Sequence, residues 1–185
     1  MNKIATIILN RNLPEVTDKL YRLIKKYNKT DIYVVEAGSS KKKLSKYCTW
    51  HANWKYASKN GLRFPRGMNY GLSRLFSENK FKKYDYFALV TNDADFVTKN
   101  FCKKINKIFK SHKRLGILSP IANNFGEKKI LKKQKLKYFW FVHNHVLFFR
   151  RELIEKLMCL DSPGYLNFLF DGNNFRGCGT ETEIV

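Results

Sequence analysis

The residues best suited to chemistry follow an apolar run near the middle of the chain. Residues 86–90 are apolar, and Asn92, Asp93 and Asp95 follow them after Thr91. Carboxylates two residues apart on a tight turn can bind one hard cation, and such a cation usually holds a phosphate. The alternative is a simple Asx turn that ends a strand. The pattern therefore predicts either a cation–phosphate site or a plain turn.

Three other carboxylates are expected in loops. An acid in the first turn of a helix would be explained by its favourable interaction with the helix dipole, but this explanation does not apply to these three. Glu36 follows the strand expected over residues 31–35, and Glu181 and Glu183 lie in a glycine-rich segment. Ligands in open α/β sheets bind at the carboxyl ends of parallel strands, so we expect Glu36 and Asp93 at one edge. There Glu36 could accept a hydrogen bond from a base or ribose. The alternative is a loop acid beside lysines 41–43.

Glu181 and Glu183 are also candidates for a general base. A glutamate in a partly desolvated pocket can take a proton from an attacking hydroxyl. Acids two residues apart are otherwise typical of a solvated chain end, and the residues alone leave both interpretations open.

A further pattern, Gly67-x-Asn69-x-Gly71, stands near the start of a helix expected over residues 66–76. Glycine lets the backbone approach a ligand, and a helix amino terminus favours phosphate. Glycines at this place can also serve packing alone. His143 and His145 are expected on one face of a strand, where two histidines are too few for a zinc site and favour packing in the core or toward an acceptor.

Apolar periodicity predicts the elements that position these residues. We expect strands over 3–9, 31–35, 84–90, 115–121 and 138–149, helices over 13–27, 66–76, 100–112 and 150–158, an irregular aromatic stretch over 50–65 and a mobile loop over 123–137. A strand, helix and strand in succession predict a parallel sheet. There is no repeat or linker, so residues 1–185 are expected to form a single α/β domain, shortened at its carboxyl end.

The composition is globular but strongly basic. Lys and Arg total 36 against 15 Asp and Glu, the net charge is +21, and 44% of residues are hydrophobic. Such a field attracts nucleotide phosphates, nucleic acid or an anionic membrane face. Four cysteines without CxxC spacing indicate neither a zinc site nor a disulfide framework, and no apolar run reaches the roughly 20 residues of a membrane span. We expect a cytoplasmic protein, in solution or peripheral at the inner face of the membrane.

The order of the motifs resembles the inverting family-two glycosyltransferases of the GT-A fold. The matching segments are IATIILNRNLPEVTDKLYRL, IYVVEAGSS, RGMNYGL, FALVTNDADF, VLFFRRELIEKL and GCGTETEI, and together they cover essentially the whole chain. The resemblance implies a Rossmann-like α/β/α sandwich with a central, mostly parallel sheet. It also implies transfer of a sugar, with inversion, from a nucleotide-diphospho-sugar to a hydroxyl of a glycan or lipid-linked acceptor, as in surface polysaccharide synthesis.

The resemblance also implies roles for single residues. Glu181 would be the base that activates the acceptor, and Asp93 and Asp95 would bind Mn2+ or Mg2+. The residues implied in nucleotide-sugar binding are Asn10, Arg11, Glu36, Gly67, Asn69, Asn92 and Asp93. Two registers of the acidic motif stay open, one with both aspartates on the metal and one with Asp93 alone.

Two other classes of protein are alternatives. A nucleic-acid-binding domain would need a contiguous basic groove, and acids at strand ends oppose one, so no specific nucleic acid is expected as a partner. A catalytically inactive transferase-like domain is the second alternative, because Glu36 stands where the family usually has Asp and because the chain is expected to be shortened at its carboxyl end.

Overall fold

The computed structural model describes residues 3–94, 99–121, 136–138 and 142–174. The strands are β1 (Ile4–Asn10), β2 (Asp31–Glu36), β3 (Cys48–His51), β4 (Tyr86–Thr91), β5 (Ile117–Leu118) and β6 (Val146–Arg150). The α-helices are α1 (Pro14–Tyr27), α2 (Lys55–Asn60), α3 (Arg63–Ser77), α4 (Phe101–Ser111) and α6 (Arg151–Leu157). Two short 3-10 helices are η1 (Lys41–Lys43) and η2 (Phe81–Lys83).

The six strands form one sheet in the order β3-β2-β1-β4-β6-β5. The pairs β3–β2, β2–β1 and β1–β4 are parallel, whereas β6 runs antiparallel to β4 and β5. Asn10 pairs with Glu36, and Glu36 pairs with His51, so the carboxyl ends of β1, β2 and β3 lie level. The predicted mostly parallel sheet is confirmed, and its polar strand ends share one edge.

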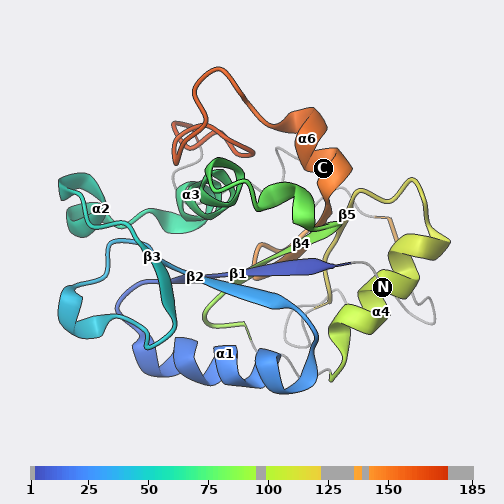
Figure 1. Cartoon of the computed structure of the whole chain (residues 1–185), viewed down its shortest axis with the longest axis horizontal. Coiled ribbons are helices and arrows are strands. Elements are labelled where there is room, and N and C mark those ends of the chain that lie inside the picture. Colours follow the sequence, from blue (N-terminus) through green and yellow to red (C-terminus); the bar gives the residue numbers. More distant parts are fainter. Residues whose placement is uncertain (1–2, 95–98, 122–135, 139–141, 175–185) are drawn as a thin grey trace.

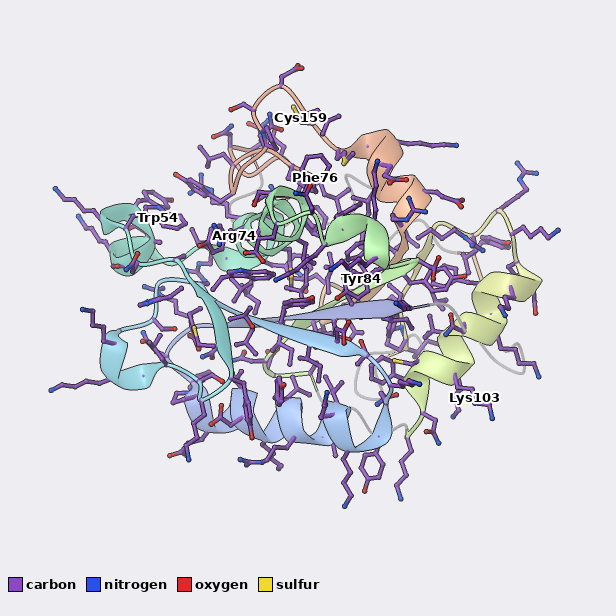
Figure 2. The ribbon with its side chains drawn as sticks, viewed as in Figure 1. Trp54, Arg74, Phe76, Tyr84, Lys103 and Cys159 are labelled. Carbon is purple, nitrogen blue, oxygen red and sulfur yellow. The ribbon has the colours of Figure 1, made fainter. Side chains whose placement is uncertain are left out.

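Helices cover both faces of the sheet (Figure 1), as the predicted α/β/α sandwich requires. β1 is buried along its whole length because its side chains alternate between two cores. Ile4 and Ile8 pack with α1 and α4, while Ile7 and Leu9 pack with α3. Figure 2 shows the side chains that fill these layers, with Lys103 on the outer side of α4. Burial on both faces makes the central strands read as continuous apolar runs.

The buried face of α1 differs from the prediction at its amino-terminal end. The helical spacing of apolar residues over 13–27 predicts Leu13 and Val16 on the core face, but they are 51% and 42% exposed. Thr17 and Asp18 are buried in their place. The Asp18 carboxylate accepts hydrogen bonds from the Ser45 hydroxyl at 2.5 Å and from the backbone N–H of Lys46 at 3.1 Å. A polar contact with the loop after β2 thus sets the rotation of this helix.

Three expected element boundaries were wrong. The stretch 50–65 is not irregular, because it contains the end of β3 and all of α2. β3 is only four residues long, which is too short for an alternating pattern to be recognised in the sequence, and its pairing with β2 shifts register between Val34 and Val35. The last sheet strand begins at Val146 instead of residue 138, since residues 144–145 form a turn. β5 is likewise shorter than expected.

The predicted start of α3 was also wrong, and this boundary matters most for function. The helix begins at Arg63, three residues before the expected start, so Gly67 and Asn69 lie inside it rather than at its amino terminus. The argument that phosphate binds there at a helix amino terminus therefore no longer holds. Across the described residues, no helix is long and apolar enough to cross a membrane.

Candidate functional site

A line of hydrogen bonds joins the carboxyl ends of three neighbouring strands. The side-chain amide of Asn92, just after β4, donates to Asn10 Oδ1 at 2.8 Å. Asn10, the last residue of β1, donates in turn to both oxygens of Glu36, at 3.0 and 2.9 Å. The structure therefore brings Asn10, Glu36 and Asn92 together at the predicted edge.

The Glu36 carboxylate is directed into the protein and is fully buried. Besides Asn10, it accepts hydrogen bonds from the Ser39 hydroxyl at 2.5 Å and from the backbone N–H of Ser45 at 2.7 Å. A buried carboxylate is stable only when its oxygens are paired in this way. Its contacts hold both ends of the loop that follows β2.

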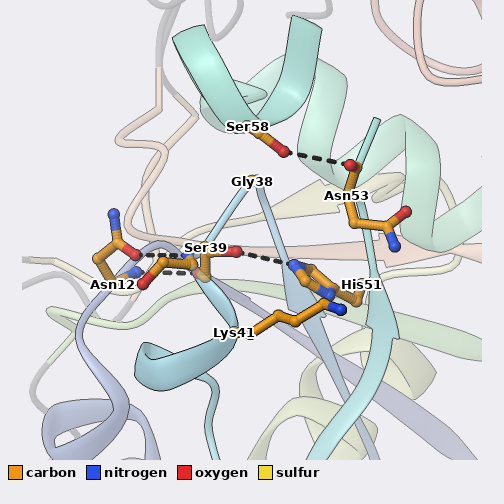
Figure 3. A pocket seen from close by; sticks show the side chains of 8 residues that line it. Asn12, Gly38, Ser39, Lys41, His51, Asn53 and Ser58 are labelled. Atoms are coloured by element: carbon orange, nitrogen blue, oxygen red, sulfur yellow. Dashed lines mark hydrogen bonds between the residues drawn. The ribbon is translucent and has the colours of Figure 1, made fainter. Parts of the chain in front are cut away.

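That loop forms one wall of a pocket of about 280 Å³ above the ends of β1, β2 and β3 (Figure 3). The lining residues are Asn12, Gly38, Ser39, Ser40, Lys41, His51, Asn53 and Ser58. Most of them are polar and short, and Lys41 is the only lysine or arginine among them. Such a lining can bind a polar, anionic ligand through hydrogen bonds and one cation.

Side-chain to backbone hydrogen bonds fix the shape of this pocket. The Asn12 N–H donates to Ser39 Oγ at 2.9 Å, and the Ser40 N–H donates to Asn12 Oδ1 at 2.9 Å. His51 Nε2 lies 2.8 Å from the Ser39 carbonyl oxygen, so this nitrogen carries the proton. Because these bonds tie the loops after β1 and β2 to β3, the pocket is largely preformed.

Sequence reasoning identified the loop after β2 but missed its partners across the pocket. His51 and Asn53 went unnoticed because β3 was read as irregular. A short polar run after a tryptophan, His51-Ala52-Asn53, was the available signal. Nothing in the local pattern identifies Ser58, which reaches the pocket from α2.

Asp93 lies two residues beyond Thr91, the last residue of β4. It directly follows Asn92, whose side chain contacts Asn10. Its side chain is 64% exposed, and Oδ1 accepts a hydrogen bond from the Thr91 hydroxyl at 2.5 Å. His145 Nδ1 lies 3.7 Å from the same oxygen. A carboxylate and an imidazole are donors that Mn2+ accepts, so the residues fit a divalent cation.

Among the described residues, no group of three or more His, Cys, Asp or Glu side chains could hold a metal. Asp95 lies outside the described residues, as do Glu181 and Glu183. Both registers of the acidic motif therefore stay open, and the role of Glu181 as general base stays a prediction.

The remaining predicted binding residues make close contacts within the fold. Arg11 donates to the backbone carbonyls of Asn60 at 3.1 Å and Lys59 at 3.3 Å, at the carboxyl end of α2. A cation is stabilised there by the helix dipole. Gly67 faces β1 so closely that an added Cβ would lie 2.3 Å from Leu9 Cδ1. Any contact of these residues with a nucleotide stays a prediction.

Asn69 is likewise buried, and it binds a segment near the end of the described chain. Its Oδ1 accepts from the N–H groups of Leu169 and Phe170, both at 2.9 Å. Its Nδ2 donates to the Phe170 carbonyl at 2.7 Å and to that of Tyr165 at 3.3 Å. Its present contacts attach the segment to α3.

Comparison with known proteins adds evidence on the fold. Among the solved structures that match is the mannosyltransferase PcManGT from Pyrobaculum calidifontis in complex with GDP-Man and Mn2+, with a TM-score of 0.60 and 13% identity. The chain has a glycosyltransferase-like fold. The match covers 84% of this chain and 46% of the mannosyltransferase, so the chain spans about half the length of that protein. No family model and no curated protein sequence matches.

Proposed function

We propose that the chain is a glycosyltransferase of the family-two type that uses a nucleotide-diphospho-sugar and a divalent cation. One observation carries the proposal: the polar pocket and Asp93 lie along the edge formed by the carboxyl ends of the parallel strands. Ligands of open α/β sheets bind at this edge. The likeness of fold to a transferase whose structure contains GDP-Man and Mn2+ supports this choice of ligand.

In this proposal the pocket between Asn12 and His51 takes the nucleoside, and Lys41 pairs with a phosphate. Glu36 acts on the nucleotide through the loop it holds rather than by direct contact, because its carboxylate is buried. Asn10 and Asn92 also act indirectly, because their hydrogen bonds fix the carboxyl ends of β2, β1 and β4 relative to one another.

The cation would be held by Asp93 together with Asp95. When bound, such an ion neutralises the diphosphate and stabilises the negative charge of the departing nucleotide. Glu181 takes the proton of the acceptor hydroxyl, and the oxygen attacks the anomeric carbon from the face opposite the nucleotide, which inverts that centre. Glycan or lipid-linked hydroxyls are the proposed acceptors.

Calorimetric titration tests the donor site. GDP and UDP, each with Mn2+, are titrated into the wild-type chain and into Asp93→Ala, with Asp161→Ala as the control at an exposed aspartate. We expect Asp93→Ala to weaken cation-dependent binding by about tenfold or more and the control to bind normally. Absence of nucleotide binding by the folded wild type, or equal binding by Asp93→Ala, would reject the proposed donor site.

Activity is measured separately, as release of the nucleotide diphosphate from a panel of nucleotide-sugars. Release that needs Glu181, tested with Glu181→Gln, is the result expected of an active transferase. Binding without any release would instead favour the inactive, transferase-like alternative.

The basic surface suggests where the acceptor is presented. The outer side of α4 carries four exposed lysines and no acid: Lys103, Lys104, Lys107 and Lys110. Each basic residue near an anionic lipid surface contributes about 1 kcal/mol. We propose peripheral contact with such a surface, which co-sedimentation with phosphatidylglycerol vesicles, compared with phosphatidylcholine vesicles, would test.

A further inference from the structure

The strand β6, which runs antiparallel to β4, brings a histidine to the acidic end of β4. The last residue pair of the two strands is Val90 with Val146. One step further, the Thr91 N–H donates to the His145 carbonyl at 3.0 Å, which continues the ladder into the turn before β6. Two backbone segments far apart in sequence therefore fix the positions of Asp93 and His145 relative to each other.

The distance between the two side chains suits a shared ion better than a direct bond. His145 Nδ1 and Asp93 Oδ1 are 3.7 Å apart, beyond hydrogen-bond distance. Two ligands that each lie about 2.1 Å from one ion are roughly 3 to 4 Å apart. Both side chains are partly exposed to solvent, with exposed fractions of 41% for His145 and 64% for Asp93. An exposed ion pair is the competing interpretation, and such pairs contribute little to stability.

We propose that His145 is a further protein ligand of the cation held by Asp93, and that it makes the site selective for Mn2+ over Mg2+. Imidazole suits transition metals, whereas Mg2+ prefers carboxylate, carbonyl and water oxygens. The inference rests on the proposed function, since it concerns the cation of the same donor site. It differs from the initial expectation that both histidines of the His143-Asn144-His145 segment serve packing.

The chain offers a matched control in His143, whose ring centroid lies 6.2 Å from that of His145. Binding of Mn2+ is measured by electron paramagnetic resonance, and binding of Mg2+ by competition, in wild type, His145→Ala, His145→Gln and His143→Ala. We expect both His145 variants to bind Mn2+ about tenfold or more weakly and to lose most of the preference over Mg2+. His143→Ala is expected to match the wild type.

A second readout follows the imidazole itself. In nitrogen-edited spectra of histidine rings, Mn2+ is expected to broaden the His145 signals at a concentration below that needed to broaden those of the exposed His112 at the carboxyl end of α4. Circular dichroism checks that each variant is folded. If wild type binds Mn2+ and the His145 variants bind it equally well, with the same preference over Mg2+, His145 is not a ligand and the donor-site proposal is unaffected. If wild type binds no Mn2+ with GDP or UDP present, both proposals fail.

Discussion

The side-chain amide of Asn10 donates to both oxygens of the Glu36 carboxylate, at 3.0 and 2.9 Å. Asn10 Oδ1 accepts from Asn92 on its other side, so one amide joins the ends of β2, β1 and β4. This amide lies between the pocket and Asp93, which makes it the centre of the candidate site. The Glu36 carboxylate therefore stabilises the shape of the site through the hydrogen bonds that it accepts.

Replacement of Glu36 by Gln tests that role. An amide would put an N–H2 group against the donors of Asn10, Ser39 or Ser45, so at least one buried donor loses its acceptor. We expect the free energy of unfolding to fall by about 1–3 kcal/mol, as measured by urea denaturation. Glu15→Gln, at an exposed acid in the first turn of α1, is the control and should change stability by less than about 0.5 kcal/mol. Equal stability of Glu36→Gln and wild type would contradict the proposed role.

Gly38 is a position where an added methyl group is expected to do harm. Its φ is +89°, and a Cβ there would lie 1.8 Å from the Ala57 carbonyl oxygen. Gly38→Ala combines backbone strain with a clash against another main chain, and we expect a loss of more than about 2 kcal/mol in unfolding free energy. Gly164→Ala is the matched control, because no atom lies within 4 Å of its Cβ. Thermal denaturation of both variants gives the comparison, and similar melting temperatures would refute the expectation.

Asn69 is expected to hold the segment over residues 165–170 to α3. Asn69→Ala leaves the N–H groups of Leu169 and Phe170 without their acceptor in a buried place. We expect a destabilisation of at least about 2 kcal/mol and faster amide exchange in this segment, measured by hydrogen–deuterium exchange. Ser73→Ala, on the same helix, is the control, since its hydroxyl donates only to the carbonyl of Tyr70 in its own helix. Unchanged exchange over residues 165–170 in Asn69→Ala would disprove the attachment.

The cysteines give a prediction that depends on pH. Burial, with a smaller contribution from the Glu36 charge, raises the pKa of the Cys48 thiol above its usual value. Burial raises the pKa of Cys102 to about 12. Because the thiolate is the reactive form, a raised pKa lowers the reactive fraction at a given pH, and reactivity increases as the pH rises.

Alkylation by iodoacetamide, followed by mass spectrometry, measures this effect. We expect Cys48 to react slowly at pH 7 and faster at pH 9, and Cys102 to react only after the protein is unfolded in urea. Rapid labelling of Cys102 in the native protein at pH 7 would show that α4 does not bury it against the sheet.

The sequence by itself determined the layered α/β architecture. Central strands such as β1 are buried on both faces and so appear as continuous apolar runs, while α4 shows its amphipathic spacing plainly. These signals are local, and therefore the central strands, the longer helices and the parallel sheet could be predicted from the chain, whereas the short β3 and α2 were missed. The edge that gathers Glu36 and Asp93 followed from strand direction alone.

Only the tertiary structure decided which way the side chains at that edge point and what they touch. Glu36 turns inward because Asn10 and Ser45, from other segments, offer it hydrogen bonds. Asp93 meets His145 because β6 pairs with β4 across more than fifty residues of chain. Such contacts depend on the register between segments distant in sequence, and no local periodicity encodes that register.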